Sequence, residues 1–90
     1  MQLRWTESAA EDFYHIARRI REDNPKASFR VMRALYEGCS SLERFPRLGR
    51  NGRKPGTREL VIRDLPYVVI YRIKSDAVEI VRVYHGAQNR

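Results

Sequence analysis

The sequence predicts an α+β domain in which a short N-terminal strand and a helical hairpin precede a three-stranded antiparallel meander that forms a curved sheet. Two observations predict this class. Apolar residues recur at helical spacing as far as residue 45, and after residue 57 they gather in runs rich in β-branched and aromatic side chains. Because 90 residues have room for one hydrophobic core, we expect residues 1–90 to form a single domain.

The beginning of the chain has the pattern of a strand followed by a helix. Residues 1–6 alternate around Leu3 and Trp5, as in a short strand. Residues 8–11 (Ser-Ala-Ala-Glu) match a capping box, with Thr6 as a competing cap, so a helix should begin here and run to about Glu22. The expected apolar face of this helix consists of Ala9, Phe13, Ile16, Ala17 and Ile20.

A second helix should follow a break at Asn24-Pro25, because proline disfavours helical geometry in the residue before it and is accepted in a first turn. We expect this helix to end at Pro46. Its expected apolar stripe consists of Val31, Ala34, Leu35, Gly38, Leu42 and Phe45. Met32 and Cys39 on the same helix are expected to fill the core rather than carry redox chemistry.

Three strands are predicted in the second half of the chain, over residues 59–62, 67–71 and 78–84. The links at residues 63–66 and 74–77 are short enough only for antiparallel hairpins. In residues 78–84 apolar side chains occupy both sets of alternate positions. Both faces of that strand should therefore be covered, by the rest of the chain or by a partner.

The positive charge of the chain is concentrated in one segment. The formal net charge is +7, but residues 46–63 alone carry six basic side chains against Glu59, and the segments on either side are nearly neutral. Glycines 49, 52 and 56 predict an exposed, adaptable loop between Pro46 and Gly56. Such a loop favours an acidic partner, although the same charges could also serve only solubility.

Several classes of protein are excluded by composition. One cysteine, Cys39, makes no intrachain disulfide, and with only His15 and His85 beside it we expect neither a metal site nor a cofactor. The longest uncharged stretch, residues 65–71, is too short to cross a bilayer, and the first residues lack the apolar run of a signal peptide. We expect a cytoplasmic protein that does not enter a membrane.

The candidate chemical groups lie near the end of the last predicted strand. If the chain cleaves RNA, His85 and Tyr84 would supply acid–base groups, and Arg58 and Arg63 would supply cations for the developing negative charge. Alternatively, His85 simply ends the strand with a hydrogen-bonded imidazole, and Arg82 pairs with Glu59 or Glu79. The aromatic residues that could stack on bases, or else belong to the core, are Trp5, Phe45, Tyr67, Tyr71 and Tyr84.

Five segments together resemble the toxins of type II toxin–antitoxin modules, the RelE/ParE superfamily. They are residues 5–9 (Trp-Thr-Glu-Ser-Ala), 23–25 (Asp-Asn-Pro), 56–62, 66–73 and 78–86. The resemblance covers almost the whole chain and implies a small bacterial toxin of a plasmid stabilisation module. It also implies a hetero-oligomer with a cognate antitoxin whose binding segment is often acidic, which suits a net charge of +7.

The superfamily divides by target. RelE-like members cut mRNA on the ribosome, whereas ParE-like members share the fold and block DNA gyrase. In RelE-like toxins the strand corresponding to residues 67–73 typically begins with an arginine that contacts the scissile phosphate, and here Val68 occupies that position. RelE-like toxins also often end in a basic, aromatic tail, whereas this sequence stops at Asn89-Arg90. His85 matches a histidine found in both groups.

The resemblance is therefore closest to the ParE-like branch, which implies a gyrase inhibitor rather than an enzyme. We expect the apolar groove between hairpin and sheet to bind the antitoxin. The expected target-binding residues are Arg50, Arg53, Lys54, Arg58 and Arg63. The alternative is a ribosome-dependent endoribonuclease in which Arg58 or Arg63 replaces the missing arginine. A third possibility is a non-toxic protein that serves only as a co-repressor with its antitoxin.

Overall fold

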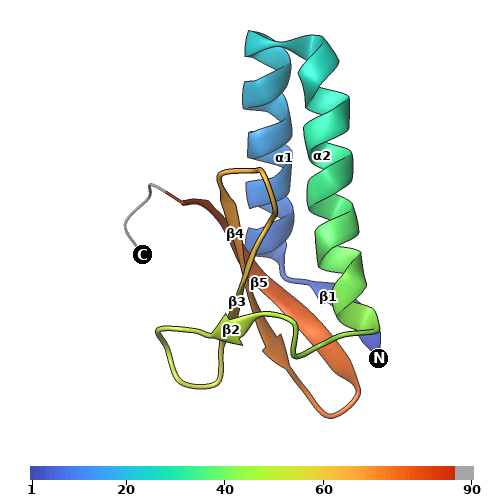
Figure 1. The fold of residues 1–90 in the computed structure, drawn as a ribbon, viewed down its shortest axis with the longest axis vertical. Coiled ribbons are helices and arrows are strands. Elements are labelled where there is room, and N and C mark those ends of the chain that lie inside the picture. Colours follow the sequence, from blue (N-terminus) through green and yellow to red (C-terminus); the bar gives the residue numbers. More distant parts are fainter. Residues whose placement is uncertain (87–90) are drawn as a thin grey trace.

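The computed structural model describes residues 1–86, in which two helices pack against one face of a sheet and extend beyond it at the hairpin tip (Figure 1). The α+β class, with its N-terminal strand, helical hairpin and antiparallel meander, is confirmed. In chain order the elements are β1 (Gln2–Trp5), α1 (Glu7–Asp23), α2 (Pro25–Ser40), the 3-10 turn η1 (Ser41–Glu43), β2 (Arg50–Asn51), β3 (Arg58–Val61), β4 (Tyr67–Ile73) and β5 (Ala77–His85).

Within residues 1–86 the strands form one sheet in the order β1-β5-β4-β3-β2. β3, β4 and β5 are the predicted antiparallel meander, and β1 pairs with β5 in the parallel direction, with Leu3 opposite Val78. β2 was not predicted. It lies in the expected loop and pairs with β3, with Arg50 opposite Glu59. A two-residue strand has no periodicity that a sequence pattern can reveal.

Both helices begin at side-chain caps. The hydroxyl of Thr6 accepts a hydrogen bond from the amide of Ala9 (3.0 Å) and donates one to the carbonyl of Val81 on β5 (2.9 Å). The competing cap, Thr6, is therefore confirmed and the capping box at Ser8 is wrong, because Thr6 gains a partner in the sheet as well as in the helix. The predicted break at Asn24-Pro25 is confirmed, since the Asn24 side chain caps α2 through the amide of Ala27.

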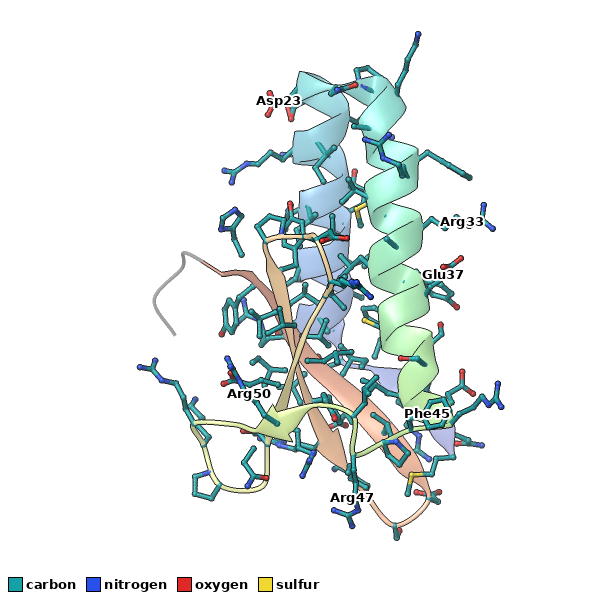
Figure 2. All side chains as sticks on the ribbon, viewed as in Figure 1. Asp23, Arg33, Glu37, Phe45, Arg47 and Arg50 are labelled. Carbon is teal, nitrogen blue, oxygen red and sulfur yellow. The ribbon has the colours of Figure 1, made fainter. Side chains whose placement is uncertain are left out.

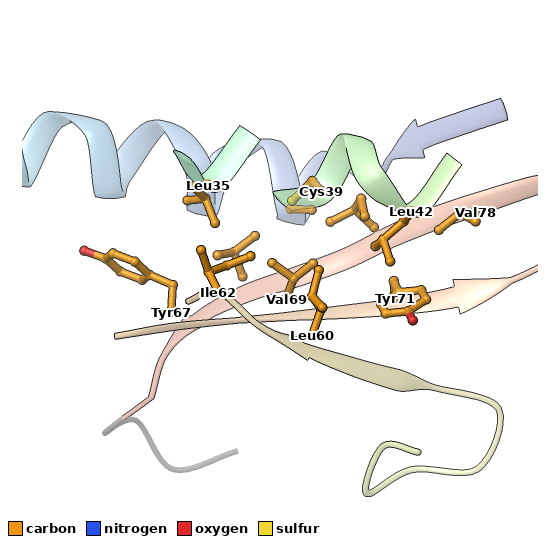
Figure 3. Close-up of a cluster of buried hydrophobic side chains, with 12 residues drawn as sticks. Leu35, Cys39, Leu42, Leu60, Ile62, Tyr67, Val69, Tyr71 and Val78 are labelled. Carbon is orange, nitrogen blue, oxygen red and sulfur yellow. The ribbon is translucent and has the colours of Figure 1, made fainter. Parts of the chain in front are cut away.

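The core lies between the hairpin and the sheet and is shown in Figure 3. Leu35, Cys39 and Leu42 from the second helical segment meet Val69 and Tyr71 of β4, all of them fully buried. Burial raises the pKa of the Cys39 thiol to about 12, so this cysteine is unreactive near neutral pH and fills space, as predicted.

The predicted end of the second helix is wrong. α2 ends at Ser40 and continues as η1, so the chain leaves the helical path before Phe45. Phe45 is 55% exposed and lies beside the guanidinium of Arg44, outside the core. An apolar residue at helical spacing belongs to the stripe only while the helix continues.

A bulge in β5 explains why its apolar residues occupy both alternate sets. Tyr71 pairs with Ile80, but the preceding residue of β4, Ile70, pairs with Arg82, so Val81 is an extra residue. The insertion lets both Ile80 and Val83 be buried on the helical side. The outer face of β5 at Glu79 is partly exposed, so the described part of the chain does not cover it there, and covering by a partner stays a prediction.

Beyond the end of β1, a carboxylate on α1 forms hydrogen bonds with β5. Trp5 is the last residue of β1 and lies opposite Ile80, so within residues 1–86 the rest of β5 has no strand on that side. Asp12 accepts a hydrogen bond from the backbone amide of Val83 (2.9 Å) and two from the guanidinium of Arg82 (2.7 and 3.1 Å). Arg82 thus pairs with Asp12, and the expected pairing with Glu59 or Glu79 is wrong.

Replacing Asp12 by alanine is expected to lower the free energy of unfolding by about 2–3 kcal/mol, because it leaves both a strand amide and a guanidinium without their acceptor. Urea unfolding followed by circular dichroism measures the change. The matched control is Glu11→Ala, one residue earlier and exposed, for which a change below about 0.5 kcal/mol is expected. Equal losses in the two variants would contradict the role of Asp12.

Candidate functional site

The basic loop, residues 46–58, lies at the end of the molecule opposite the hairpin tip, and Figure 2 shows Arg47 and Arg50 on it. The buried side chain of Tyr71 fixes the base of this loop. The hydroxyl of Tyr71 donates to the carbonyl of Pro46 (2.7 Å) and accepts from the amide of Gly49 (2.9 Å). A Cβ at Gly49 would approach the Tyr71 hydroxyl to 2.8 Å, so only glycine fits here.

Arg58 holds the same loop from the sheet side. Its guanidinium donates to the backbone carbonyls of Gly49 and Arg47 and to the side chain of Asn51, at distances between 2.6 and 3.2 Å. The expected adaptable loop is therefore an ordered one, fixed by Arg58 and Tyr71. Arg58 acts within the molecule as a positioning residue, and its expected contact with a target stays a prediction.

The other predicted target-binding residues fall into two places. Arg50, Arg53 and Lys54 share the exposed side of the basic loop. Arg50 is paired at 3.2 Å with Glu59, whose side chain is only 5% exposed, so a buried carboxylate orients an exposed cation. Arg63 follows β3 and lies at the opposite end of that strand from Arg58, away from the loop.

The four residues of the nuclease hypothesis are not gathered in one place. Tyr84 and His85 are successive residues of β5, so their side chains point to opposite faces of the sheet. The guanidinium of Arg82 lies over the Tyr84 ring at 4.9 Å, and the His85 ring meets Tyr67 edge-to-face at 5.7 Å. Arg58 lies opposite Tyr71, roughly 13 Å along β4 from the pair of Tyr67 and His85.

Val68, which stands where we expected an arginine in a nuclease, has apolar and aromatic neighbours. Val68 is 7% exposed and lies between Val61 on β3 and Tyr84 on β5 in the register of the sheet. Of the possible stacking residues, Tyr67 and Tyr71 belong to the core, and Trp5 packs against Phe13 and Tyr36.

An apolar groove of about 570 Å³ lies on the helical hairpin itself. Phe13, Phe29, Met32 and Tyr36 line it, with Phe29 75% exposed. The core fills part of the space between hairpin and sheet, where we expected an antitoxin groove, and a cleft of about 750 Å³ with mixed polar and apolar lining stays open at the hairpin-tip side of it. That the antitoxin binds there stays a prediction. The signal for the hairpin groove was the spacing of residues 29, 32 and 36, a second apolar stripe on α2 beside the one that faces the sheet.

Two further features bear on the class of site. Among residues 1–86 the structure contains no group of three or more His, Cys, Asp or Glu side chains arranged to hold a metal ion. Within the same residues neither helix has the length and hydropathy required to span a membrane.

Comparison with known families now adds to this geometry. Residues 3–90 match the model of a family described as the ParE toxin of the type II toxin–antitoxin system parDE. The chain belongs to this family. A Sinorhizobium fredii protein named toxin Y4kP is 40% identical to it over 97% of this chain and 90% of the relative, and Toxin RelE2 of Caulobacter vibrioides is 34% identical over 97% of both.

Solved structures agree with this assignment. A structure described as the chromosomal ParDE toxin–antitoxin system from P. aeruginosa matches with a TM-score of 0.86 and 25% identity, over 94% of this chain and 95% of that one. The toxin–antitoxin complex RelBE2 from Mycobacterium tuberculosis matches with a TM-score of 0.67 and 29% identity, over 93% and 95%. This ParE-family chain is thus the toxin of a type II toxin–antitoxin system, within the RelE/ParE superfamily.

Substituting Tyr71 by phenylalanine is expected to loosen the basic loop, because the hydroxyl that joins Pro46 to Gly49 is lost. Amide hydrogen exchange at Gly49 should become faster, and the free energy of unfolding should fall by about 1–2 kcal/mol. Tyr84→Phe on β5 is the control and should leave the Gly49 amide unaffected. Unchanged exchange at Gly49 in the Tyr71 variant would show that the phenol does not fix the loop.

Proposed function

We propose that this toxin inhibits DNA gyrase in the cytoplasm, as a binding protein rather than an enzyme, and that a cognate antitoxin neutralises it in a hetero-oligomer. The supporting observation is Val68. It is buried between Val61 and Tyr84, where mRNA-cutting relatives have an arginine on the scissile phosphate. Valine cannot stabilise the negative charge that develops on a phosphate during cleavage, so the expected catalytic cation is missing.

The basic loop is the proposed contact with the target. Arg50, Arg53 and Lys54 lie on a loop that Tyr71 and Arg58 already hold in place. An ordered loop loses less conformational entropy on binding than a flexible one, and its positive charge favours an acidic surface on the partner. Arg63 would take part only in a contact that spans the length of β3.

The second candidate function is ribosome-dependent mRNA cleavage. The relatives named RelE favour it, and so does the position of Arg63, Tyr84 and His85 at the same end of the sheet. In this case Tyr84 and His85 would supply the acid–base groups and Arg63 the cation.

Expression of the chain alone from a repressed promoter separates the two functions. We expect DNA replication to stop before translation, with covalent gyrase–DNA complexes recovered from the cells. Lys54→Glu should weaken growth inhibition about tenfold through lost charge complementarity, whereas Lys26→Glu, the same change at the start of α2, should not.

Tyr84→Phe should retain toxicity under this proposal. Translation that stops first, with mRNA cut on the ribosome and toxicity lost in Tyr84→Phe, would favour the nuclease function. A chain without effect on either process would favour the role of co-repressor.

The hairpin groove is the proposed antitoxin site. Phe29 and Tyr36 expose an apolar surface, and Arg21 and Arg33 line the same groove. An amphipathic helix with acidic residues beside its apolar face fits this combination, because the apolar face fills the groove and the acidic groups meet the arginines. A solved relative captured as a toxin–antitoxin complex supports the presence of such a partner.

Replacing Phe29 by glutamate should weaken antitoxin binding at least tenfold, because it places a charge in the apolar groove. Growth inhibition should persist when the antitoxin is co-expressed, and calorimetry with the purified proteins measures the affinity. Tyr14→Glu is the matched control, since Tyr14 is also an exposed helical aromatic but lies outside the groove. Equal neutralisation of both variants would place the antitoxin elsewhere.

A further inference from the structure

A second cavity, of about 750 Å³, lies between α1 and the ends of β4 and β5, and we call it the α1–β5 cleft. None of the residues that line the hairpin groove lines it, and it contains no residue of the basic loop. Its helical wall includes His15, Arg18 and Arg19, and its sheet wall is formed by Tyr67, Val83 and His85.

The register of the sheet explains why this cleft exists. Val69 and Val83 form one pair and Tyr67 and His85 the next, so all four side chains belong to the face that the helices cover. Figure 3 shows Tyr67 at one end of the buried cluster. At this level the facing stripe of α1 is polar, because residues 12, 15, 18, 19 and 22 are Asp, His, Arg, Arg and Glu. These polar side chains do not fill the space between α1 and the sheet, so a cavity remains there.

The charge of the cleft is positive. The carboxylate of Asp12 is already bound by Arg82 and the amide of Val83, so it does not neutralise the cleft arginines. Glu22 lies one turn from Arg18 and Arg19 on α1, within reach of either. With Arg82 bound to Asp12, three guanidinium groups therefore stand against two carboxylates in and beside the cleft. Burial raises the pKa of the Tyr67 hydroxyl, while the positive charge of Arg19, which lines the same cleft, acts in the opposite direction.

The cleft also has aliphatic and aromatic lining. Ile16 of α1 and Val83 of β5 contribute aliphatic side chains, and the rings of Tyr67 and His85, which meet edge-to-face, line the cleft as well. A bound molecule would therefore meet two guanidinium groups on one side and aliphatic and aromatic surface on the other. The volume lies in the range of small-molecule sites and exceeds what a bare inorganic anion requires.

We propose that the α1–β5 cleft binds a nucleotide-sized phosphate ester, with Arg18 and Arg19 on the phosphate and the base against the exposed ring of His85. A phosphate offers several anionic oxygens to two adjacent guanidinium groups, whereas one carboxylate satisfies one of them. An exposed aromatic ring suits a nucleobase, which stacks on it. The ligand is either a free nucleotide or one nucleotide unit of a single strand.

Titration of the ¹⁵N-labelled full chain with adenosine 5′-monophosphate, followed by NMR, tests the proposal. We expect saturable shifts at the amides of Val83, His85 and the facing turns of α1. Arg19→Gln should weaken binding about tenfold, because it removes a charge-assisted contact to phosphate. Arg30→Gln on α2 removes the same charge outside the cleft and should bind like the parent.

A 5′-phosphorylated oligothymidylate distinguishes the two sources of the ligand. Tighter binding of the oligonucleotide at the same amides assigns the cleft to a strand, and preference for the mononucleotide assigns it to a free nucleotide. Equal weakening in Arg19→Gln and Arg30→Gln would overturn the proposal, since the attraction would then be unspecific. Shifts at these amides with a hexaglutamate peptide but not with the nucleotide would overturn it too, in favour of an acidic protein segment.

Discussion

The structure depends on how the hairpin attaches to β5 beyond the end of β1. Thr6 and Asp12 form hydrogen bonds with the part of β5 that lies beyond the end of β1. Arg82 of β5 adds an ion pair with Asp12. These side chains fix the height and rotation of α1 over the sheet. The core beneath it, the polar stripe that leaves the α1–β5 cleft open, and the groove on the outside of the hairpin all follow from that placement.

Most of the fold could be predicted because its signals are local. The Asn24-Pro25 break, the apolar stripes and the change to β-branched residues after Thr57 each depend on neighbouring residues, and these predictions were confirmed except for Phe45, which lies beyond the end of α2. The errors concern contacts between distant residues. Thr6 caps α1 in place of Ser8 because β5 offers it a carbonyl, and the bulge at Val81 arises from pairing with β4.

The candidate site was predictable in composition but not in arrangement. Charge counting found the basic loop, since charge is a property of the sequence alone. It could not show that Arg58 points inward to three acceptors while Arg50 is paired with a buried carboxylate, because both contacts need the loop folded over β3. The hairpin groove was missed although residues 29, 32 and 36 stand at helical spacing, because one stripe per helix was assigned to the core.

The parallel pairing of β1 with β5 has a consequence for biosynthesis. β5 lies inside the sheet, between β1 and β4, yet it is the last of the described strands to leave the ribosome. Until residues 77–85 emerge, β1 and β4 lack a shared neighbour and α1 lacks the partners of Thr6 and Asp12. The sheet therefore closes only after nearly the whole described chain has been translated, and a nascent toxin does not present its finished surface before residues 77–85 have emerged.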